Sequence, residues 1–341
     1  MPDSAPVRDA DIISLTTALC AIDSTTGREG AVGEHLAHVL EGLGYTVERQ
    51  RVTDGRHNLY AWRDEPVVVL STHMDCVPPF IPPTEDAEWL HGRGTCDAKG
   101  LIAAMVGAGE QLARAGERRV GLLFVVGEER GSDGAKLAAT LAPRGRYLIN
   151  GEPTEGKLCI GQKGTLRVDV SATGRAAHSG YPHEGRSAVD ALLATLARMQ
   201  ALPLPADPLL GASTLNIGVL AGGVAPNVIP AEARAEIAIR TVTDSGALRE
   251  ALVACAGPDV TVRFPLEIPV VRCGAPPGWE TTVVAYSSDL PLLASWGTPF
   301  QLGPGTILVA HTDGERIRKA ELVEGAHQYA RLARQLLAEA A

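Results

Sequence analysis

Residues 67–78 read VVVLSTHMDCVP, and this stretch decides the fold. Its apolar, β-branched beginning is too short for a helix and predicts a buried strand, which the prolines after it end. His73 and Asp75 leave the end of that strand together, because residues at i and i+2 of an extended chain point to one face. In one interpretation, His73 binds a metal ion and the carboxylate of Asp75 orients its imidazole. In the other, His73 is a solvated histidine at a strand end. The downstream sequence favours the first interpretation.

Strands and helices alternate through the first half of the chain. This alternation predicts an α/β sheet, in which sites form beyond the carboxyl ends of the strands. A long proline-rich loop is expected over 78–90, and such loops are often functional. The expected elements are helices within 10–43, strands at 45–51, 58–62 and 67–72, a helix at 101–115, a strand at 120–126, a helix at 132–141 and a strand at 147–150.

Carboxylates follow the ends of these predicted strands. Glu128 and Glu129 come after the strand at 120–126, Glu152 comes after the strand at 147–150, and Asp97 lies on a glycine-flanked loop. Mixed imidazole and carboxylate ligands suit Zn²⁺ first, with Co²⁺ or Mn²⁺ as alternatives. With His73 and a late histidine, His311, the set exceeds the three protein ligands usual for one catalytic zinc. It therefore predicts two metal ions that share one carboxylate.

Adjacent residues at a strand end point apart, so one of Glu128 and Glu129 can bind metal while the other transfers protons. Asp97, on its tight loop, is a good bridge between two ions. The other members of the set are consistent with terminal ligands.

From about residue 163 the pattern changes to a β-α-β-β-α-β order, which is that of the split-βαβ, ferredoxin-like sandwich. The chain therefore predicts a catalytic domain at 1–162 and 267–341 with an inserted domain at 163–266. The expected elements are strands at 166–172, 213–220, 231–240 and 260–264, helices at 187–201 and 246–256, and, after a loop at 265–280, a strand at 299–302 and a helix at 319–339.

Composition narrows the class of protein. The 341 residues carry a net charge of −9, which argues against nucleic-acid or anionic-membrane partners. No apolar run approaches the length of a membrane span. The 6 cysteines form no CxxC pair, which suits small buried side chains in a reducing cytoplasm.

An ordered set of motifs resembles the M20 family of metallohydrolases, which groups acetylornithine deacetylases, succinyl-diaminopimelate desuccinylases, aminoacylases and glutamate carboxypeptidases. The resemblance covers nearly the whole chain. Its motifs are Thr72-His73-Met74-Asp75-Cys76-Val77-Pro78, Gly92-Arg93-Gly94-Thr95-Cys96-Asp97-Ala98-Lys99-Gly100, Gly127-Glu128-Glu129, Asn150-Gly151-Glu152-Pro153-Thr154, Ala177-His178-Ser179, Asn227-Val228-Ile229-Pro230 and His311.

The resemblance implies roles for the strand-end residues. His73 and Glu152 would bind one metal ion, Glu129 and His311 would bind the other, and Asp97 would bridge them. Asp75 would support His73, and Glu128 would be the general acid and base. A cis peptide bond is expected between Asp97 and Ala98.

The tail motif departs from the family pattern. Family members often read His-x-x-Asp-Glu, whereas this chain reads HTDGE over 311–315. The histidine and the glutamate keep their places, so His311 is retained as a ligand. Asp313 stands one residue early and receives no role.

The inserted domain would be the family's lid and dimerisation domain, and a homodimer is expected. The resemblance implies that His178 reaches a substrate carbonyl in the partner subunit's site and that Asn227 approaches the substrate. It also implies that Arg240 receives a substrate carboxylate, a role that suits the fork of a guanidinium. Solvation at the surface for His178 and an ordinary ion pair for Arg240 are the alternatives.

The expected reaction is amide hydrolysis of N-acyl amino acids, with acetylornithine-type deacylation as the leading hypothesis. The choice leans on Glu152, because in this family a Glu at that position goes with acylases and carboxypeptidases. A metallopeptidase, either a dipeptidase or a glutamate carboxypeptidase-like enzyme, is the first alternative. A non-catalytic amino-acid-binding homologue is the second.

Overall fold

The computed structural model describes residues 9–141 and 145–340, and the chain divides into two compact units. Unit 1 comprises Met1–Ile160, Arg272–Thr282 and Ser288–Ala341, and unit 2 comprises Gly161–Val271 and Val283–Ser287. The inserted domain predicted at 163–266 falls within unit 2, which also takes in 161–162, 267–271 and 283–287. A Cβ atom on Gly161 would lie 3.4 Å from the carbonyl oxygen of Val271, so the main segment of unit 2 begins and ends at one place.

Unit 1 is built on a mixed nine-stranded sheet, so the predicted α/β class is confirmed. Its order is β1-β2-β6-β3-β7-β17-β8-β15, with β16 paired to β8, and β6, β3, β7 and β17 run parallel. Every residue of β3 and β6 is buried, as expected for central parallel strands covered on both faces. The bounds are β1 (Thr46–Thr53), β2 (Arg56–Trp62), β3 (Val68–His73), β6 (Val120–Val125), β7 (Tyr147–Gly151), β8 (Leu158–Gln162), β15 (Val271–Arg272), β16 (Thr281–Val284) and β17 (Thr298–Leu302).

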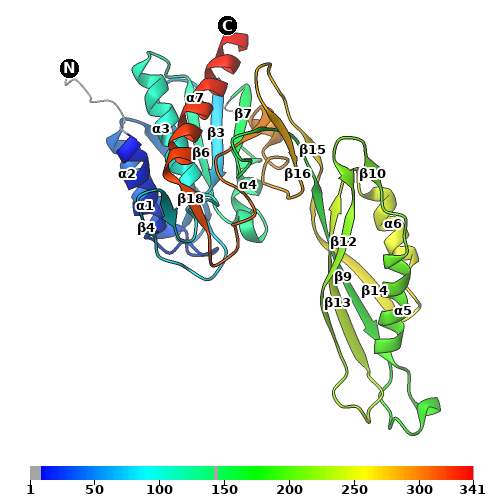
Figure 1. Cartoon of the computed structure of the whole chain (residues 1–341). Helices are drawn as coiled ribbons and strands as arrows, with labels where there is room; N and C mark the ends of the chain where they lie inside the picture. The colour runs from blue at the N-terminus through cyan, green and yellow to red at the C-terminus, as the bar shows by residue number, and fades with distance from the viewer. Residues whose placement is uncertain (1–8, 142–144, 341) are drawn as a thin grey trace. The chain divides into compact units, whose positions relative to one another are not determined.

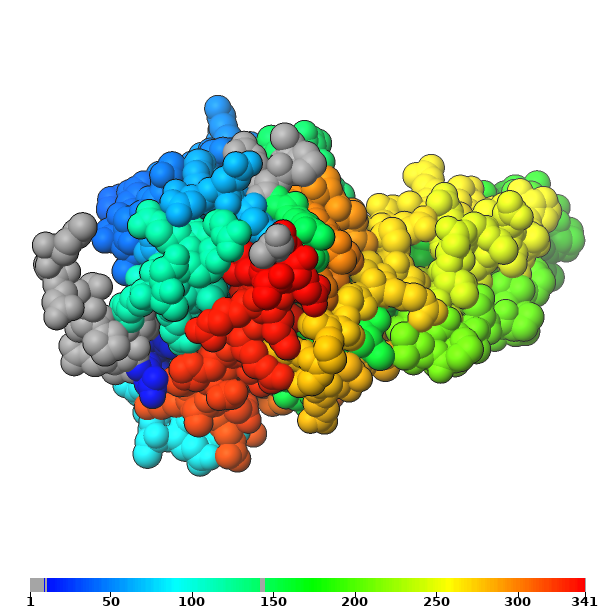
Figure 2. All heavy atoms as spheres, turned by 90° about the horizontal axis from the view of Figure 1, so that it is seen from above, coloured from blue at the N-terminus to red at the C-terminus, as the bar shows by residue number. Residues whose placement is uncertain are grey.

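Helix α3 packs against α1 and α7, and α3 and α7 also contact β3 (Figure 1). The space-filling view also shows α7, in red, against α3 (Figure 2). The close packing requires small residues, because a Cβ atom on Gly107 would lie 2.9 Å from the side chain of Ile12. None of the described helices is both long and apolar enough to cross a membrane. The helices of unit 1 are α1 (Asp9–Cys20), α2 (Gly30–Gly42), α3 (Lys99–Arg114), α4 (Asp133–Ala138) and α7 (Lys319–Ala340), with 3₁₀ turns η1 (Glu128–Arg130) and η3 (Ala294–Trp296).

Short strands were the main omission of the sequence-based prediction. The loop expected over 78–90 contains β4 (Thr84–Glu85) and leads into β5 (Trp89–His91), which pair with β18 (Arg316–Arg318) in a three-stranded sheet. Strands β8, β15 and β16 were also missed, and α4 ends before the predicted residue 141. Strands of two or three residues are too short for a period-2 pattern, and β8 and β16, which read LCIGQ and TTVV, show no alternation of apolar and polar residues. Their pairing partners determine them.

Unit 2 has the predicted β-α-β-β-α-β order. Its four-stranded antiparallel sheet has the order β12-β13-β9-β14, and α5 and α6 cover one face with a shared apolar core. Residues along β9 alternate between buried and exposed from Leu166 onward, as the sequence predicts. The elements are β9 (Gly164–Thr173), η2 (Pro182–Glu184), α5 (Ala188–Gln200), β10 (Ala206–Asp207), β11 (Gly211–Ala212), β12 (Thr214–Gly222), β13 (Glu232–Thr241), α6 (Gly246–Ala254) and β14 (Val260–Ile268).

Candidate active site

The carboxyl ends of three neighbouring parallel strands form the candidate site in unit 1. His73 is the last residue of β3, Glu128 and Glu129 begin η1 after β6, and Glu152 follows β7. Asp97 enters the same region just before α3. Ligand atoms of His73, Asp97 and Glu129 all lie within 4.8 Å of one another, close enough to hold a metal ion.

Asp97 lies between the two histidines. Its Oδ1 atom is 3.0 Å from Nε2 of His73, and its Oδ2 atom is 3.4 Å from Nε2 of His311. His311 Nε2 also lies 3.0 Å from Oε2 of Glu129. The structure therefore brings these predicted ligands together, with the aspartate in the position that a shared carboxylate would need. The peptide bond between Asp97 and Ala98 is cis, as the resemblance implied.

Glu152 adjoins this cluster with an unsatisfied carboxylate. The residue is only 5% exposed, and its Oε1 atom has no hydrogen-bond partner among the described residues. Burial raises its pKa well above the usual value. A buried carboxylate without a partner is costly unless it is protonated or faces a cation. The donor set and this orphaned oxygen both fit divalent metal ions.

Both histidines hold their protons tightly in the metal-free protein. Burial would lower the pKa of His73, but hydrogen bonds to Asp75 and Asp97 outweigh it and raise that pKa well above its usual value. Hydrogen bonds to Asp97 and Glu129 raise the pKa of His311 to about 10. An imidazole must be neutral to bind a metal ion, so metal ions would compete with protons for the ring nitrogen atoms of these histidines.

Asp75 is completely buried behind His73 and organises two neighbouring residues. Its Oδ1 atom accepts a hydrogen bond from the backbone N–H of Glu128 at 3.0 Å, and its Oδ2 atom accepts one from that of Glu129 at 3.2 Å. His73 Nδ1 lies 2.9 Å from the main-chain oxygen of Asp75 and 3.5 Å from its carboxylate. Asp75 therefore fixes the backbone of both glutamates through its carboxylate and orients the histidine chiefly through its main-chain oxygen.

Glu315 performs a similar task for Asp97, although the tail motif implied no role for it. Its Oε1 atom accepts hydrogen bonds from the backbone N–H groups of Gly94, Cys96 and Asp97 at 2.8, 3.2 and 3.1 Å. Its Oε2 atom pairs with the buried guanidinium of Arg93 at 2.7 Å. The segment that follows His311 thereby holds the loop that carries Asp97. Asp313 is exposed.

Glu128 differs from the other carboxylates in having no place among the predicted ligands. Burial raises its pKa well above the usual value. The charge of His73 lowers this pKa, and the charges of Asp289 and Glu152 raise it further. Asp289, which the sequence did not single out, is buried, and burial raises its pKa to about 7. A carboxylate with a raised pKa beside a metal site is suited to take up and release a proton.

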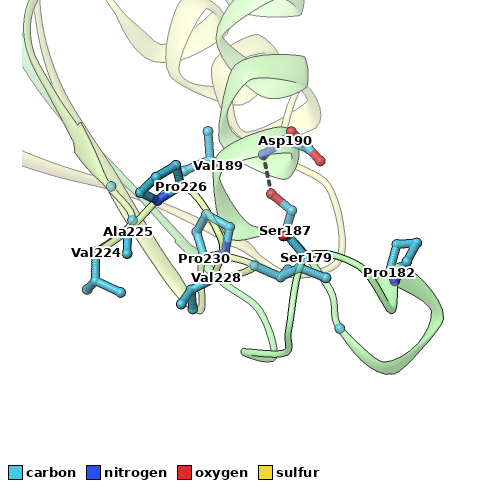
Figure 3. Close-up of a pocket in the computed structure, with 14 residues that line it drawn as sticks. Ser179, Pro182, Ser187, Val189, Asp190, Val224, Ala225, Pro226, Val228 and Pro230 are labelled. Atoms are coloured by element: carbon cyan, nitrogen blue, oxygen red, sulfur yellow. Dashed lines mark hydrogen bonds between the residues drawn. The ribbon is translucent and has the colours of Figure 1, made fainter.

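His178 and Asn227 lie near each other in unit 2. A β-bridge joins His178 to Val228, and the N–H of Ser179 donates to the main-chain oxygen of Asn227 at 3.0 Å. Both side chains are exposed. Beside them is a hollow of about 820 Å³, in which Val224, Val228 and Pro230 lie across from Ser179 (Figure 3).

Arg240 lies at the other end of the same sheet, where β13 pairs with the beginning of β9. Its Nη1 atom donates to the hydroxyl groups of Thr165 and Ser287, the latter at 3.3 Å. The side chain is half-buried, so these hydroxyls fix its direction. Its predicted role and those of His178 and Asn227 remain predictions.

Comparisons with known proteins place this site in context. A model of the peptidase dimerisation domain matches residues 160–256. The chain is 40% identical over 340 residues to a peptidase M20 domain-containing protein of Schizosaccharomyces pombe, with 94% of this chain and 84% of that protein covered. It is 39% identical over 387 residues to a Neosartorya fischeri protein named "Probable carboxypeptidase", with coverage of 96% and 86%.

Solved structures share the fold at low sequence identity. The aminopeptidase PepT of Bacillus cereus superposes with a TM-score of 0.80 at 20% identity, covering 97% of this chain and 99% of that one. An M20 family metallo-carboxypeptidase of Sulfolobus solfataricus gives 0.76 at 16% identity, with coverage of 96% and 99%. A dinuclear metal binding peptidase of Bacillus subtilis gives 0.70 at 15% identity, with coverage of 95% and 97%.

Proposed function

The chain belongs to the M20 peptidase family, and we propose that it is a metal-dependent carboxypeptidase. The observation that carries the proposal is the cluster in which the buried Asp97 lies between His73 and His311, with the raised-pKa carboxyl group of Glu128 near it. The name of the Neosartorya fischeri relative supports the choice of a carboxypeptidase. Acetylornithine-type deacylation, the leading hypothesis from the sequence, takes second place.

Two divalent metal ions would be held by the predicted ligands, with zinc first and cobalt or manganese as alternatives. When bound, such ions polarise an amide carbonyl and make a water molecule more acidic. These ligands would be His73, Asp97, Glu129, Glu152 and His311.

Glu128 would carry the proton of the reaction. Its raised pKa favours uptake of a proton from the attacking water. The same group then delivers that proton to the nitrogen of the leaving amine. Asp75 fixes the backbone of Glu128 and so sets where this exchange takes place.

Arg240 would bind the C-terminal carboxylate of the substrate. Its guanidinium is held by two hydroxyl groups and can pair with both oxygens of a carboxylate. An N-acyl amino acid also presents a carboxylate next to an acylated amine, and Glu152 fits acylases as well as carboxypeptidases. Deacylation of N-acyl amino acids is therefore the second candidate.

A substrate panel tests the proposal and separates the alternatives. The protein is loaded with zinc or cobalt and given an N-blocked dipeptide, its C-terminal amide, an unblocked dipeptide, and N-acetyl, N-succinyl and N-formyl amino acids. We expect cleavage of the blocked dipeptide and not of its amide. Turnover confined to acyl amino acids indicates a deacylase, turnover confined to the unblocked dipeptide indicates a dipeptidase, and metal binding without turnover indicates a non-catalytic homologue.

We also propose a homodimer in which His178 completes the partner subunit's site. The match to a peptidase dimerisation domain supports it. So does β12, an outer strand of its sheet, near which Leu220 and Val224 are 55% and 87% exposed. Light scattering measures the assembly. Subunit exchange between His178→Ala and Glu128→Ala proteins, each inactive alone, should restore partial activity, and failure to do so despite exchange contradicts the sharing.

A further inference from the structure

The carboxylate of Asp75 has a partner outside the strands that carry the predicted ligands. The hydroxyl group of Thr26 donates a hydrogen bond to Oδ2 of Asp75 at 2.9 Å. That oxygen also accepts the backbone N–H of Glu129, while Oδ1 accepts that of Glu128. Because Asp75 is fully buried, each of these donors replaces a water molecule that an exposed carboxylate would have.

The hydrogen bond from Thr26 fixes the orientation of the Asp75 carboxylate, because it is made to Oδ2, the oxygen that also accepts the N–H of Glu129. Without the hydroxyl, Oδ2 would keep only the longer contact to Glu129. The carboxylate would then be less firmly fixed, and so would the groups that depend on it.

The backbone holds Thr26 in place independently of its side chain. Residues 24–26 run beside Cys76 as a short parallel bridge, in which the N–H of Thr26 donates to the oxygen of Cys76 and the N–H of Cys76 donates to that of Ser24, both at 3.1 Å. Thr26 is half-buried. The hydroxyl group of Thr26 lies 2.9 Å from Oδ2 of Asp75 and 3.5 Å from the main-chain oxygen of Cys76, so the shorter contact is the one to the carboxylate. Loss of the hydroxyl removes these two contacts and leaves the backbone bridge that holds the loop in register.

We propose that Thr26 is a positioning residue, which acts on the reaction and on metal binding through Asp75. It keeps the carboxylate of Asp75 oriented, and Asp75 in turn fixes the backbone of Glu128 and Glu129 and supports the imidazole of His73. The catalytic part of this inference rests on the proposed function. The metal-binding part rests on the contacts alone.

The direct test is Thr26→Val, which keeps the shape of the side chain and loses the donor. We expect kcat to fall ~10-fold with KM little changed, and the affinity for zinc to fall ~10-fold. This is the lower end of the range for loss of a direct partner of a metal ligand, because Thr26 acts through Asp75. Thr26→Ser restores the hydroxyl group and should return both quantities to within about threefold of the wild type, since the hydrogen bond is regained. Should Thr26→Val fail to fold, Thr26→Ala takes its place with the same expectation.

Thr25→Val is the matched control. The hydroxyl group of Thr25 bonds to Asp23 on the same loop, and its backbone N–H keeps a bond to that carboxylate at 2.9 Å. This variant should match the wild type in kcat and in zinc affinity. Equal losses in Thr25→Val and Thr26→Val would show a general effect of the loop and overturn the proposal.

Calorimetric titration with zinc needs no substrate, so the inference can be tested even if no peptide in the panel is cleaved. A wild type that binds zinc without turnover would contradict the proposed function. The inference on metal binding would still hold in that case if Thr26→Val binds zinc ~10-fold more weakly than the wild type. Unchanged zinc affinity in Thr26→Val, or a Thr26→Ser protein as weak as Thr26→Val, would overturn it.

Discussion

The two histidines of the cluster have the same predicted role and very different surroundings. The side chain of His73 is 2% exposed at the end of a buried strand, whereas that of His311 is 53% exposed on a loop. His311 also has a left-handed backbone, with φ of 63°, which few residues other than glycine adopt. His73 is thus held by its contact with Asp75. His311 lies on a loop that is held through Glu315, which bonds to the backbone of 94–97.

This contrast shows that one site can combine a fixed half and an adjustable half. Strand ends place His73 and Glu152 as a consequence of the sheet itself. The loop at 303–315 has to be held by individual hydrogen bonds, and such segments open more easily than core strands. We therefore expect substitutions in the two halves to differ in the size and kind of their effects.

The largest effect should follow from His73→Ala. The change removes a predicted ligand and leaves Asp97 and Glu152 as buried carboxylates without their cationic neighbour. We expect loss of activity and a fall in zinc affinity of at least ~100-fold, the upper end of the effect of losing an orienting partner. Calorimetry measures the affinity, His38→Ala on the exposed face of α2 is the control, and near-normal zinc binding would contradict the assignment.

Glu315→Ala should come next, because it releases the loop that carries Asp97. The variant leaves the buried guanidinium of Arg93 unpaired, which typically costs about 3–5 kcal/mol, and thermal unfolding should show it. Glu315→Gln keeps an acceptor for the backbone N–H groups and loses the ion pair, so it should bind zinc better than Glu315→Ala. If both variants bind zinc as the wild type does, the loop does not need this carboxylate.

Most of the fold could be predicted from the sequence, because the strands that carry the ligands are apolar runs of five or six residues. The inserted unit could also be predicted, since β9 and α5 show clear periods. The small sheet of β4, β5 and β18 could not, because it depends on pairing between segments more than 200 residues apart. Short strands of this kind leave no local pattern.

The ligand set followed from residue types at strand ends and from the resemblance, but the supporting contacts did not. Thr26 looks like an ordinary turn residue, and only the fold brings it next to Asp75. Asp289 carries no local signal of burial. Glu315 stood in a known place of the tail motif, yet its contacts with 94–97 depend on a loop that no period describes.

His311→Ala should have a smaller effect than His73→Ala. It removes a half-exposed ligand from one of the two predicted metal positions and leaves the strand-end residues intact. We expect activity to fall while one equivalent of zinc is retained, as measured by metal analysis after dialysis. Loss of all bound zinc would mean that the two halves of the site are not separable.

The smallest expected effect is the dependence of stability and zinc affinity on the protonation of His311. The pKa of His311 is raised from about 6.5 to about 10 in the metal-free protein, so this group stabilises the fold fully below pH 6.5. The contribution is lost as pH rises through about 10, and the exposure of the side chain keeps it small. Zinc must displace the proton, so zinc affinity should rise with pH over this window.

Calorimetry in buffers with different heats of ionisation counts the released protons. The wild type should release about one proton more than His311→Ala at neutral pH, because the raised pKa keeps His311 protonated there. Equal proton release by the two proteins would show that His311 is neutral before zinc binds.

The main segment of unit 2, Gly161–Val271, begins and ends at the same place, and this affects how the polypeptide folds. Strands β7 and β17 are hydrogen-bonded neighbours, yet the whole of Gly161–Val271 separates them along the chain. Closing a long flexible loop carries an entropy cost that grows with its length. Once the inserted segment has folded by itself, Gly161 and Val271 are adjacent, and the effective loop contains only the residues of 152–160 and 272–297. Early folding of the insertion would thereby speed the completion of the parallel sheet, whose distant pairings are intrinsically slow to form.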